Sequence, residues 1–478
     1  MDSGLANIPG AVGFAAPGAR LFPVMSPEDA VVPAQFHGGA GVSELLSRLT
    51  GRSWREKEES VRKLIACGVA LVATLALTVP GAFGGAEQTP GVTAKRIVVG
   101  GTFPLTGPAA AYAPIPLGMR AYFSYINARR GPDGKRGVMG RQIVWKYYDD
   151  GYNPANTVQL TRKLVEEDKV FATVGQLGTE HNLAVRPYLN QAKVPQALVS
   201  SGASYFGTQF KEYPWTTGWQ PDYIAEGRVY GLHIKANHGG KKIAVIYQND
   251  DYGKDYLFGL RVGLGKSYAD QNIVSTEAVE VTATSSASQM AKIRSSGAAV
   301  LVIFQTPTPT VRSIATGKAL GYNPDQIYMN SVSAFRAPMD GAVASAGAAY
   351  VNGLLSVTYL KDADSPRWDN DPALKLYRQI VEKYLPGRNF RDGQIYYGFA
   401  KGETFVQAMY KAGKNPTRAG FMNALLSLNS ANKFALPGVT QKTTKSDRWI
   451  ISQMQLQRFN ANEKVWVPIG KLIDGRPR

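Results

Sequence analysis

The fold of this chain is constrained most by an alternation of short apolar runs and helical segments over residues 96–332. The apolar runs, such as Ile97–Thr102 and Val170–Gly175, are rich in β-branched residues and bounded by glycine, which is typical of buried strands. Segments between them, such as residues 116–129, place apolar residues three and four positions apart, which indicates helices. Strands that alternate with helices of about a dozen residues predict βαβ units and parallel sheets.

The alternation breaks at residues 213–223, which are rich in aromatic residues and proline, and it resumes at residue 242. We therefore expect two α/β lobes of similar build. The remaining predicted strands are Gln142–Tyr148, Gln196–Ser200, Lys242–Tyr247, Ile273–Val281, Ala299–Phe304 and Gln326–Asn330, with a β-hairpin at 451–459 and 464–470. The remaining predicted helices begin at Pro154 or span 180–192, 253–268, 286–296, 309–320, Ala373–Tyr384 and Gly398–Ala412.

The loops that follow the strands are the predicted binding region, because open α/β sheets bind small molecules beyond the carboxyl ends of their strands. These loops are rich in Gly, Ser, Thr, Tyr and Asn. If the two lobes face each other, the loops line one shared cleft. The loops are residues 102–112, 149–153, 175–181, 200–206, 248–254, 304–309 and 330–335.

Motifs of common enzyme classes are missing from these loops. The glycines around residues 100–107 have the spacing of neither nucleotide-binding motif, and Ser204 lacks the second glycine of a nucleophile elbow. The acid pairs Asp149-Asp150 and Asp250-Asp251 are interpreted as caps of turns and helices. We predict no catalytic residues, no cofactor and no enzymatic activity.

Composition argues against two further classes of protein. The chain has one cysteine, Cys67, and four scattered histidines, so we predict no internal disulfide and no metal site. The net charge of +18 would suit nucleic acid, but no block of five or more basic residues occurs. We therefore predict no nucleic-acid partner.

The N-terminal region has the features of an export signal. Arg62 and Lys63 precede the uncharged run Leu64–Val79, and small residues follow it. This pattern predicts a signal peptide at residues 61–86, and hence a location on the periplasmic or extracellular side of the cell envelope. A retained membrane anchor is the alternative, although the run is shorter than the roughly 20 residues of a membrane span. Residues 1–60 are interpreted as an over-extended gene model or a disordered segment.

Five motifs, in this order and spacing, resemble those of the leucine/isoleucine/valine-binding proteins of ABC importers. The motifs are G-x-x-x-P-L-T-G-P-x-x-x-Y from Gly100, D-D-x-x-N-P from Asp149, V-G-x-x-x-T from Val174, V-P-x-x-x-x-S from Val194 and N-D-D-Y-G-K from Asn249. The resemblance spans about residues 95–475 and implies the type I periplasmic binding fold. That fold has two Rossmann-like lobes, a three-strand hinge and a ligand in the interlobe cleft. The implied lobes are 95–217 plus 350–438, and 218–349 plus 439–478.

The resemblance also implies a set of ligand-binding residues. Hydroxyls and backbone N–H groups of the first lobe would hold a carboxylate, whereas the same residue types can equally cap helices. The implied carboxylate site comprises Leu177, Gly178, Thr179, Gly202, Ala203 and Ser204. Tyr112 would form a pocket wall, Tyr252 would cover the ligand, and Thr306, Asn330 and Ser331 stand at further binding positions.

The chain departs from the amino-acid binders at one position. Those proteins carry a glutamate after the strand that ends near Asn330, where it pairs with the ligand's ammonium group, but residues 329–333 contain no acid. An unpaired buried ammonium is costly, so we hypothesise a carboxylate-bearing or neutral ligand such as an organic acid, an aromatic acid or an amide. Asp222 or Asp250 could replace the missing acid for an amino acid.

The function implied by the resemblance is that of an extracytoplasmic solute-binding receptor. It would be a monomer that captures its small-molecule ligand by lobe closure and delivers it to an ABC permease at the membrane, as in amino-acid transport. Two alternatives are a ligand sensor of the same fold that serves a signalling partner, and an enzyme on an α/β scaffold.

Overall fold

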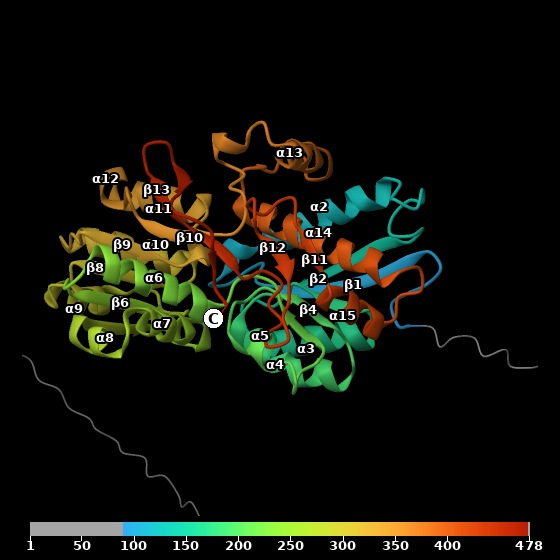
Figure 1. The fold of residues 1–478 in the computed structure, drawn as a ribbon, viewed down its shortest axis with the longest axis horizontal. Helices are drawn as coiled ribbons and strands as arrows, with labels where there is room; N and C mark the ends of the chain where they lie inside the picture. The colour runs from blue at the N-terminus through green and yellow to red at the C-terminus, as the bar shows by residue number, and fades with distance from the viewer. Residues whose placement is uncertain (1–88, 477–478) are drawn as a thin grey trace, which may run out of the picture. The chain divides into compact units, whose positions relative to one another are not determined.

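The computed structural model describes residues 89–476. Residues 1–60 and the predicted signal peptide at 61–86 lie outside the described residues. The described residues form two large open sheets, each with helices packed against it, and one two-stranded sheet (Figure 1). Within the described range, no helix combines the length and the apolar character that crossing a membrane requires.

The first sheet has the strand order β2-β1-β3-β4-β5, and all neighbouring strands are parallel. Its strands are β1 (Arg96–Phe103), β2 (Gln142–Asp149), β3 (Ala172–Val174), β4 (Gln196–Val199) and β5 (Thr216–Gly218). Its helices are α2 (Ile115–Ala128), α3 (Pro154–Glu166), α4 (Thr179–Gln191), α5 (Tyr205–Thr208), α13 (Pro372–Tyr384), α14 (Gly393–Ala412) and α15 (Arg418–Leu426). Figure 1 shows α2 and α14 on the opposite side of this sheet from α3 and α4.

The second sheet has the order β14-β13-β10-β9-β8-β6-β7, with β15 beside β13. Strands β6 to β10 are parallel, and β13 runs antiparallel to β10, β14 and β15. Its strands are β6 (Ile243–Gln248), β7 (Ile273–Val279), β8 (Val300–Phe304), β9 (Gln326–Met329), β10 (Leu355–Thr358), β13 (Gln453–Asn460), β14 (Val465–Pro468) and β15 (Ile473–Asp474). Its helices are α6 (Tyr223–Asn237), α7 (Asp251–Leu264), α8 (Lys266–Asn272), α9 (Ala287–Ser295), α10 (Pro307–Ala319), α11 (Arg336–Ala346) and α12 (Ala348–Val351).

The predicted alternation of strands and helices is confirmed, as is the C-terminal hairpin of β13 and β14. The predicted helix at 253–268 is wrong in one respect, because it ends at Leu264 and α8 begins at Lys266. Gly265 between them has a φ of 80°, a left-handed conformation that glycine adopts without strain.

The chain passes between the two sheets three times: after β5, after β10, and between β12 (Thr440–Lys442) and β13. Among the described strands, β12 pairs only with β11 (Asn429–Ala431). Strand β10 belongs to the second sheet, although the predicted boundary assigns residues from 350 onward to the first lobe. The other lobe boundaries stay predictions.

Helices α6 and α7 pack at unusually close range through glycines spaced four residues apart. Gly227 and Gly231 on α6 face backbone atoms of α7, while Gly259 and Gly263 on α7 face backbone atoms of α6. A Cβ atom at any of the four would lie 2.2–2.4 Å from a carbonyl oxygen of the other helix. This contact fixes the ends of α6 and α7 that carry Tyr223 and Tyr252, both of which reach the site described next.

Candidate functional site

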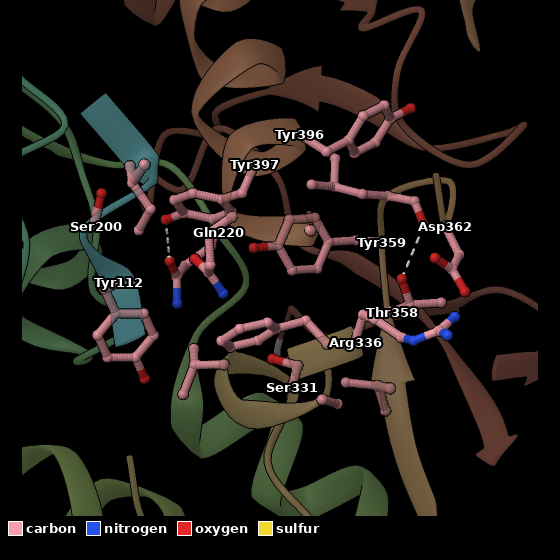
Figure 2. A pocket seen from close by; sticks show the side chains of 18 of the residues that line it. Tyr112, Ser200, Gln220, Ser331, Arg336, Thr358, Tyr359, Asp362, Tyr396 and Tyr397 are labelled. Atoms are coloured by element: carbon pink, nitrogen blue, oxygen red, sulfur yellow. Dashed lines mark hydrogen bonds between the residues drawn. The ribbon is translucent and has the colours of Figure 1, made fainter. Parts of the chain in front are cut away.

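Loops from both sheets enclose a cavity of about 140 Å³ (Figure 2). These loops follow all five strands of the first sheet, β1 to β5, and β6, β8, β9 and β10 in the second. The cavity therefore lies beyond the carboxyl ends of the parallel strands, where binding sites of α/β sheets occur. This is the edge at which the sequence places the candidate loops.

Seven of the residues implied by the resemblance line the cavity, and four do not. Those that line it are Tyr112, Leu177, Gly178, Thr179, Tyr252, Thr306 and Ser331. Those that the structure leaves out of the lining are Gly202, Ala203, Ser204 and Asn330.

The four residues outside the lining are held by contacts of their own, and the N–H of Ala203 donates to Ser201 Oγ at 3.1 Å. Ser204 precedes α5, and its N–H donates to Asp255 Oδ2 at 2.8 Å. Gly202 lies behind Tyr223, because a Cβ atom on it would be 2.5 Å from that ring. Asn330 is fully buried, and its Nδ2 donates to the Gln305 carbonyl at 3.0 Å.

The loop after β1 is held by Asp149, the last residue of β2. Its Oδ1 accepts the N–H of Leu105 at 2.9 Å, and its Oδ2 accepts the hydroxyl of Thr106 at 2.6 Å. The interpretation of this acid as a turn cap is thus confirmed. The loop leads to Tyr112, which is buried with its ring centroid 6.4 Å from that of Phe335.

The walls of the cavity are rich in neutral aromatic groups. Seven tyrosines line it: Tyr112, Tyr152, Tyr223, Tyr252, Tyr359, Tyr396 and Tyr397. Burial raises the pKa of each of these hydroxyls above its ordinary value, so they remain protonated and can donate hydrogen bonds. The ring of Tyr152 lies 4.2 Å from that of His181, and burial lowers the pKa of this histidine to about 4. Both rings are therefore neutral at pH 7.

Sequence reasoning did not assign several lining residues to the site. Tyr152 and Ser200 stand in loops that follow strands, so their position could have identified them. Tyr396 and Tyr397 lie on α14, where a buried aromatic residue gives the same signal as an ordinary core residue. The other lining residues that it missed include Gln220, Tyr223, Arg336, Tyr359, Asp362, Arg391, Gln394 and Trp466.

The charged residues that line the cavity are mostly basic. They are Arg336, Lys361, Arg391 and, as the one acid among the described lining residues, Asp362. Arg336 and Arg391 both pair with Asp364, and Lys361 Nζ lies 2.7 Å from Asp371 Oδ2. Burial raises the pKa of Asp362, which favours its neutral form. The charged side chains of the lining are thus mostly basic, and each of these basic groups is paired with an acid outside the lining.

Neither acid suggested as a substitute for the missing glutamate lines the cavity. Asp222 caps α6 by accepting the N–H of Ile224 at 2.6 Å, and Asp250 caps α7 by accepting that of Gly253 at 3.1 Å. Behind Ser331 lies the fully buried Glu226, whose two oxygens accept the Ser331 N–H and hydroxyl, each at 2.7 Å. This carboxylate holds the cavity wall but does not face the cavity. Residues 89–476 contain no cluster of acids, histidines or cysteines that could hold a metal ion.

Asp222 should make the stability of the protein pH-dependent. Burial raises the pKa of Asp222 to about 7, so between about pH 4 and pH 7 the folded state binds this proton more tightly than the unfolded state. The free energy of unfolding therefore falls as pH rises through this window. The side chain in Asp222→Asn cannot titrate. We expect the free energy of unfolding of this variant to fall by about 2 kcal/mol less between pH 4.5 and 7.5, because partial solvent access moderates the pKa shift of Asp222. Urea unfolding of both proteins at the two pH values measures this, and identical falls would contradict it.

Two α/β sheets whose facing loops enclose a cavity lined with hydroxyl groups define a receptor for a small molecule. The chain belongs to the periplasmic binding protein family, whose family model matches residues 96–464. Membership of this family implies export to the periplasm and solute binding. The predictions of the family and of the type I periplasmic binding fold are confirmed.

Three similar proteins illustrate the relationship. An amino acid binding protein of Pseudomonas aeruginosa is 24% identical over 328 residues, which is 68% of this chain and 81% of that protein. A fatty acid ABC transporter substrate-binding protein from Thermomonospora curvata superimposes with a TM-score of 0.68 at 20% identity and covers 82% of this chain and 96% of its own. A branched-chain amino acid ABC transporter structure from Thermus thermophilus with bound valine gives a TM-score of 0.67 at 18% identity and covers 80% and 97%.

Proposed function

We propose that this protein is the solute-binding receptor of a branched-chain-amino-acid-type ABC importer and that it captures a small carboxylate-bearing or neutral ligand between its two sheets. It would be exported by the signal at residues 61–86 and deliver its ligand, as a monomer, to a membrane permease. The observation that carries the proposal is the cavity, which has hydroxyl donors from both sheets and basic residues in its lining. The named relatives support it, because two of them are components of ABC transporters.

The size of the cavity supports a compact ligand. Its volume of about 140 Å³ is close to the roughly 150 Å³ that accommodates one benzene molecule in an engineered protein cavity. Tyr112 and Phe335 give it apolar walls. The similar protein from Thermomonospora curvata is named for fatty acids, which are carboxylates without an ammonium group. An aromatic or short aliphatic acid therefore fits the proposed site.

Capture by closure is supported by hydrogen bonds between helices that belong to different sheets. The N–H of Asp251 on α7 donates to Glu180 Oε1 on α4 at 3.1 Å, and Asp255 on α7 accepts from Ser204 beside α5. Such bonds would hold the two sets of loops together over a ligand. Exclusion of water then strengthens each polar contact with that ligand.

The contacts of Ser200 favour binding over catalysis. Ser200 lines the cavity and contacts the basic side chain of Lys401. Its hydroxyl donates to the Gly175 carbonyl at 2.7 Å and accepts from Lys401, so its proton is not presented to a base. This arrangement orients the hydroxyl and does not activate it as a nucleophile.

A thermal-shift screen tests the proposal. The purified protein is heated with amino acids, aromatic acids, fatty acids, dicarboxylates and amides, since a ligand that binds only the folded state raises the melting temperature. We expect the largest rise with a monocarboxylic acid. If leucine or valine gives the largest rise, the inference from the missing glutamate is wrong. If no compound raises the melting temperature, the receptor function itself is contradicted.

Thr179 should be a direct ligand contact. Its Oγ1 lies 2.7 Å from Ser201 Oγ, which also accepts the Ala203 N–H at 3.1 Å. Ser201 can therefore donate to Thr179 and leave the Thr179 proton for a ligand. We expect Thr179→Ala to weaken binding of an acid by about 1.5–3 kcal/mol, the range for a hydrogen bond to a charged group.

Ser204→Ala is the matched control for this prediction, because Ser204 has the same type of hydroxyl but does not line the cavity. Its effect on affinity should be smaller than that of Thr179→Ala. Isothermal titration with the best acid from the screen gives both values. An equal loss in the two variants would contradict the assignment of Thr179.

A further inference from the structure

Lys401 is a buried basic residue immediately behind the cavity wall. It lies on α14, and its side chain is 0% exposed. Its Nζ donates to Ser200 Oγ and, at 2.9 Å, to Tyr397 OH, and both of these residues line the cavity. Among the described residues, no carboxylate contributes to the pKa of Lys401, which burial lowers well below its ordinary value.

The surroundings of Lys401 are built to hold this side chain. Its Nζ lies 4.9 Å from the ring centroid of Trp219 and 4.4 Å from that of Tyr397, within the range of cation–π attraction. Gly175 leaves room for the lysine stem, since a Cβ atom there would lie 2.8 Å from Lys401 Cδ. Burial of an ammonium group without a counter-charge is costly. A partner of opposite charge is therefore the group that this pocket lacks.

The hydrogen bonds around Lys401 all run in one direction. Tyr397 accepts from Lys401 and donates to Gln220 Oε1 at 2.6 Å, and Gln220 Nε2 in turn lies 3.3 Å from Tyr223 OH. Each donor in this chain points away from the lysine, and Ser200 likewise donates to the Gly175 carbonyl. Lys401 would therefore act on a ligand through its charge, and a carboxylate at this end of the cavity would favour the charged form of this buried lysine. Figure 2 shows Ser200, Gln220 and Tyr397 together at one end of the cavity, with Asp362 and Arg336 at the other.

We propose that Lys401, acting through Ser200 and Tyr397, makes this end of the cavity selective for the carboxylate of a monocarboxylic acid. The proposal rests on the receptor function above and narrows its ligand class from acids or neutral molecules to acids. Lys401 does not touch the ligand. It determines specificity because a charge one hydroxyl group away acts strongly in a site of low dielectric constant.

Matched acid and amide pairs test this selectivity. Benzoate with benzamide, phenylacetate with phenylacetamide, and hexanoate with hexanamide differ in charge but hardly in shape. Isothermal titration of the purified full-length protein should give at least about tenfold tighter binding of the acid in the pair that fits the cavity, since tenfold corresponds to about 1.4 kcal/mol. In Lys401→Met the ratio of acid to amide affinity should fall to about threefold or less.

Control variants separate this role from a structural one. Methionine preserves most of the volume of the lysine, and apolar replacement of a buried charge is often tolerated. Ser200→Ala leaves Lys401 in place but cuts one of its two links to the cavity, so it should also lower the ratio. Lys433→Met is the matched control: Lys433 also lies over an aromatic ring, that of Phe434, but it pairs with Glu403 and does not line the cavity, so its removal should leave the ratio nearly unchanged.

The possible failures are distinguishable. Equal affinity for acid and amide in the unmodified protein, or an unchanged preference in both Lys401→Met and Ser200→Ala, overturns the carboxylate-selective end and leaves the receptor function standing. If leucine or valine binds most tightly and Lys401→Met does not change that affinity, the carboxylate-selective end is likewise overturned and the receptor function stands. If no acid, amide or amino acid binds, the receptor function is overturned together with this proposal.

Discussion

Gly259→Ala is expected to lower the free energy of unfolding by about 2–3 kcal/mol, the usual cost of overpacking a well-packed contact. A Cβ atom at this position would lie 2.2 Å from the carbonyl oxygen of Ile224. Helices α6 and α7 would have to separate, and no side-chain movement can relieve a contact with backbone. Because Tyr223 and Tyr252 stand on these helices, ligand affinity should fall as well.

Gly341→Ala provides the matched control for Gly259→Ala. Gly341 lies within α11. A Cβ atom added to it would have as its nearest neighbour a side-chain carbon of Val311 at 3.4 Å, an ordinary contact distance. Here alanine should raise the free energy of unfolding by about 0.5–1 kcal/mol through its helix propensity. Urea unfolding followed by circular dichroism measures both changes. A stabilising effect of both alanines would show that α6 and α7 are not held by close glycine contacts.

The same glycines explain why the start and the extent of α6 were not predicted. Residues 223–237 contain Gly227 and Gly231, and glycine is a poor helix former, so local propensity argues against a helix there. The glycines are favourable only because α7 packs against them, which is a tertiary contact. Strands such as β1 and β8 were predictable because apolar runs bounded by glycine carry their signal locally.

The position of the site was predictable from topology, whereas many of its side chains were not. Loops at the carboxyl ends of parallel strands give residues such as Tyr112 and Thr179 by position and resemblance. Ser204 matched the same motif, but it precedes α5, its N–H donates to Asp255, and it lies outside the cavity lining, so a contact with the ligand stays a prediction. Lys401 joins Ser200 from a helix 201 residues further along the chain, and no local pattern indicates such a contact.

The acid that is missing after β9 also shows that local sequence does not reveal contacts between distant segments. The absence of an acidic residue after β9 was visible in the sequence, and Asp222 and Asp250 were the two suggested substitutes. The structure places a different carboxylate, Glu226, beneath Ser331. Glu226 comes from the first turn of α6, a helix whose start was not predicted. The role of this carboxylate therefore has to be tested directly.

Glu226→Ala is expected to lower the free energy of unfolding by about 3 kcal/mol or more. The carboxylate accepts the Ser331 N–H and hydroxyl and the hydroxyl of Tyr230, which lies 2.7 Å from Oε1. Its removal leaves the N–H and the hydroxyl of Ser331 without this acceptor, at about 1–3 kcal/mol for each fully buried group, whereas the Tyr230 hydroxyl can still donate to the Met329 carbonyl at 2.9 Å. Ser331→Ala, which removes a single donor, should cost only about 1 kcal/mol. Urea unfolding of the two variants gives the comparison, and equal losses would contradict the role of Glu226 as a shared acceptor.

Glu226→Gln separates position from charge. The glutamine amide keeps one acceptor oxygen but loses the other. The loop at Ser331 should therefore shift, and the affinity for every ligand should fall. Because Glu226 does not line the cavity, we expect an acid and its matched amide to lose affinity by the same factor in isothermal titration. If Glu226→Gln instead weakens the binding of an amino acid more than that of the acid and the amide, this expectation is contradicted. Glu226 would then supply, from behind Ser331, the counter-charge that the sequence lacks after β9, and an amino acid would again be the better ligand.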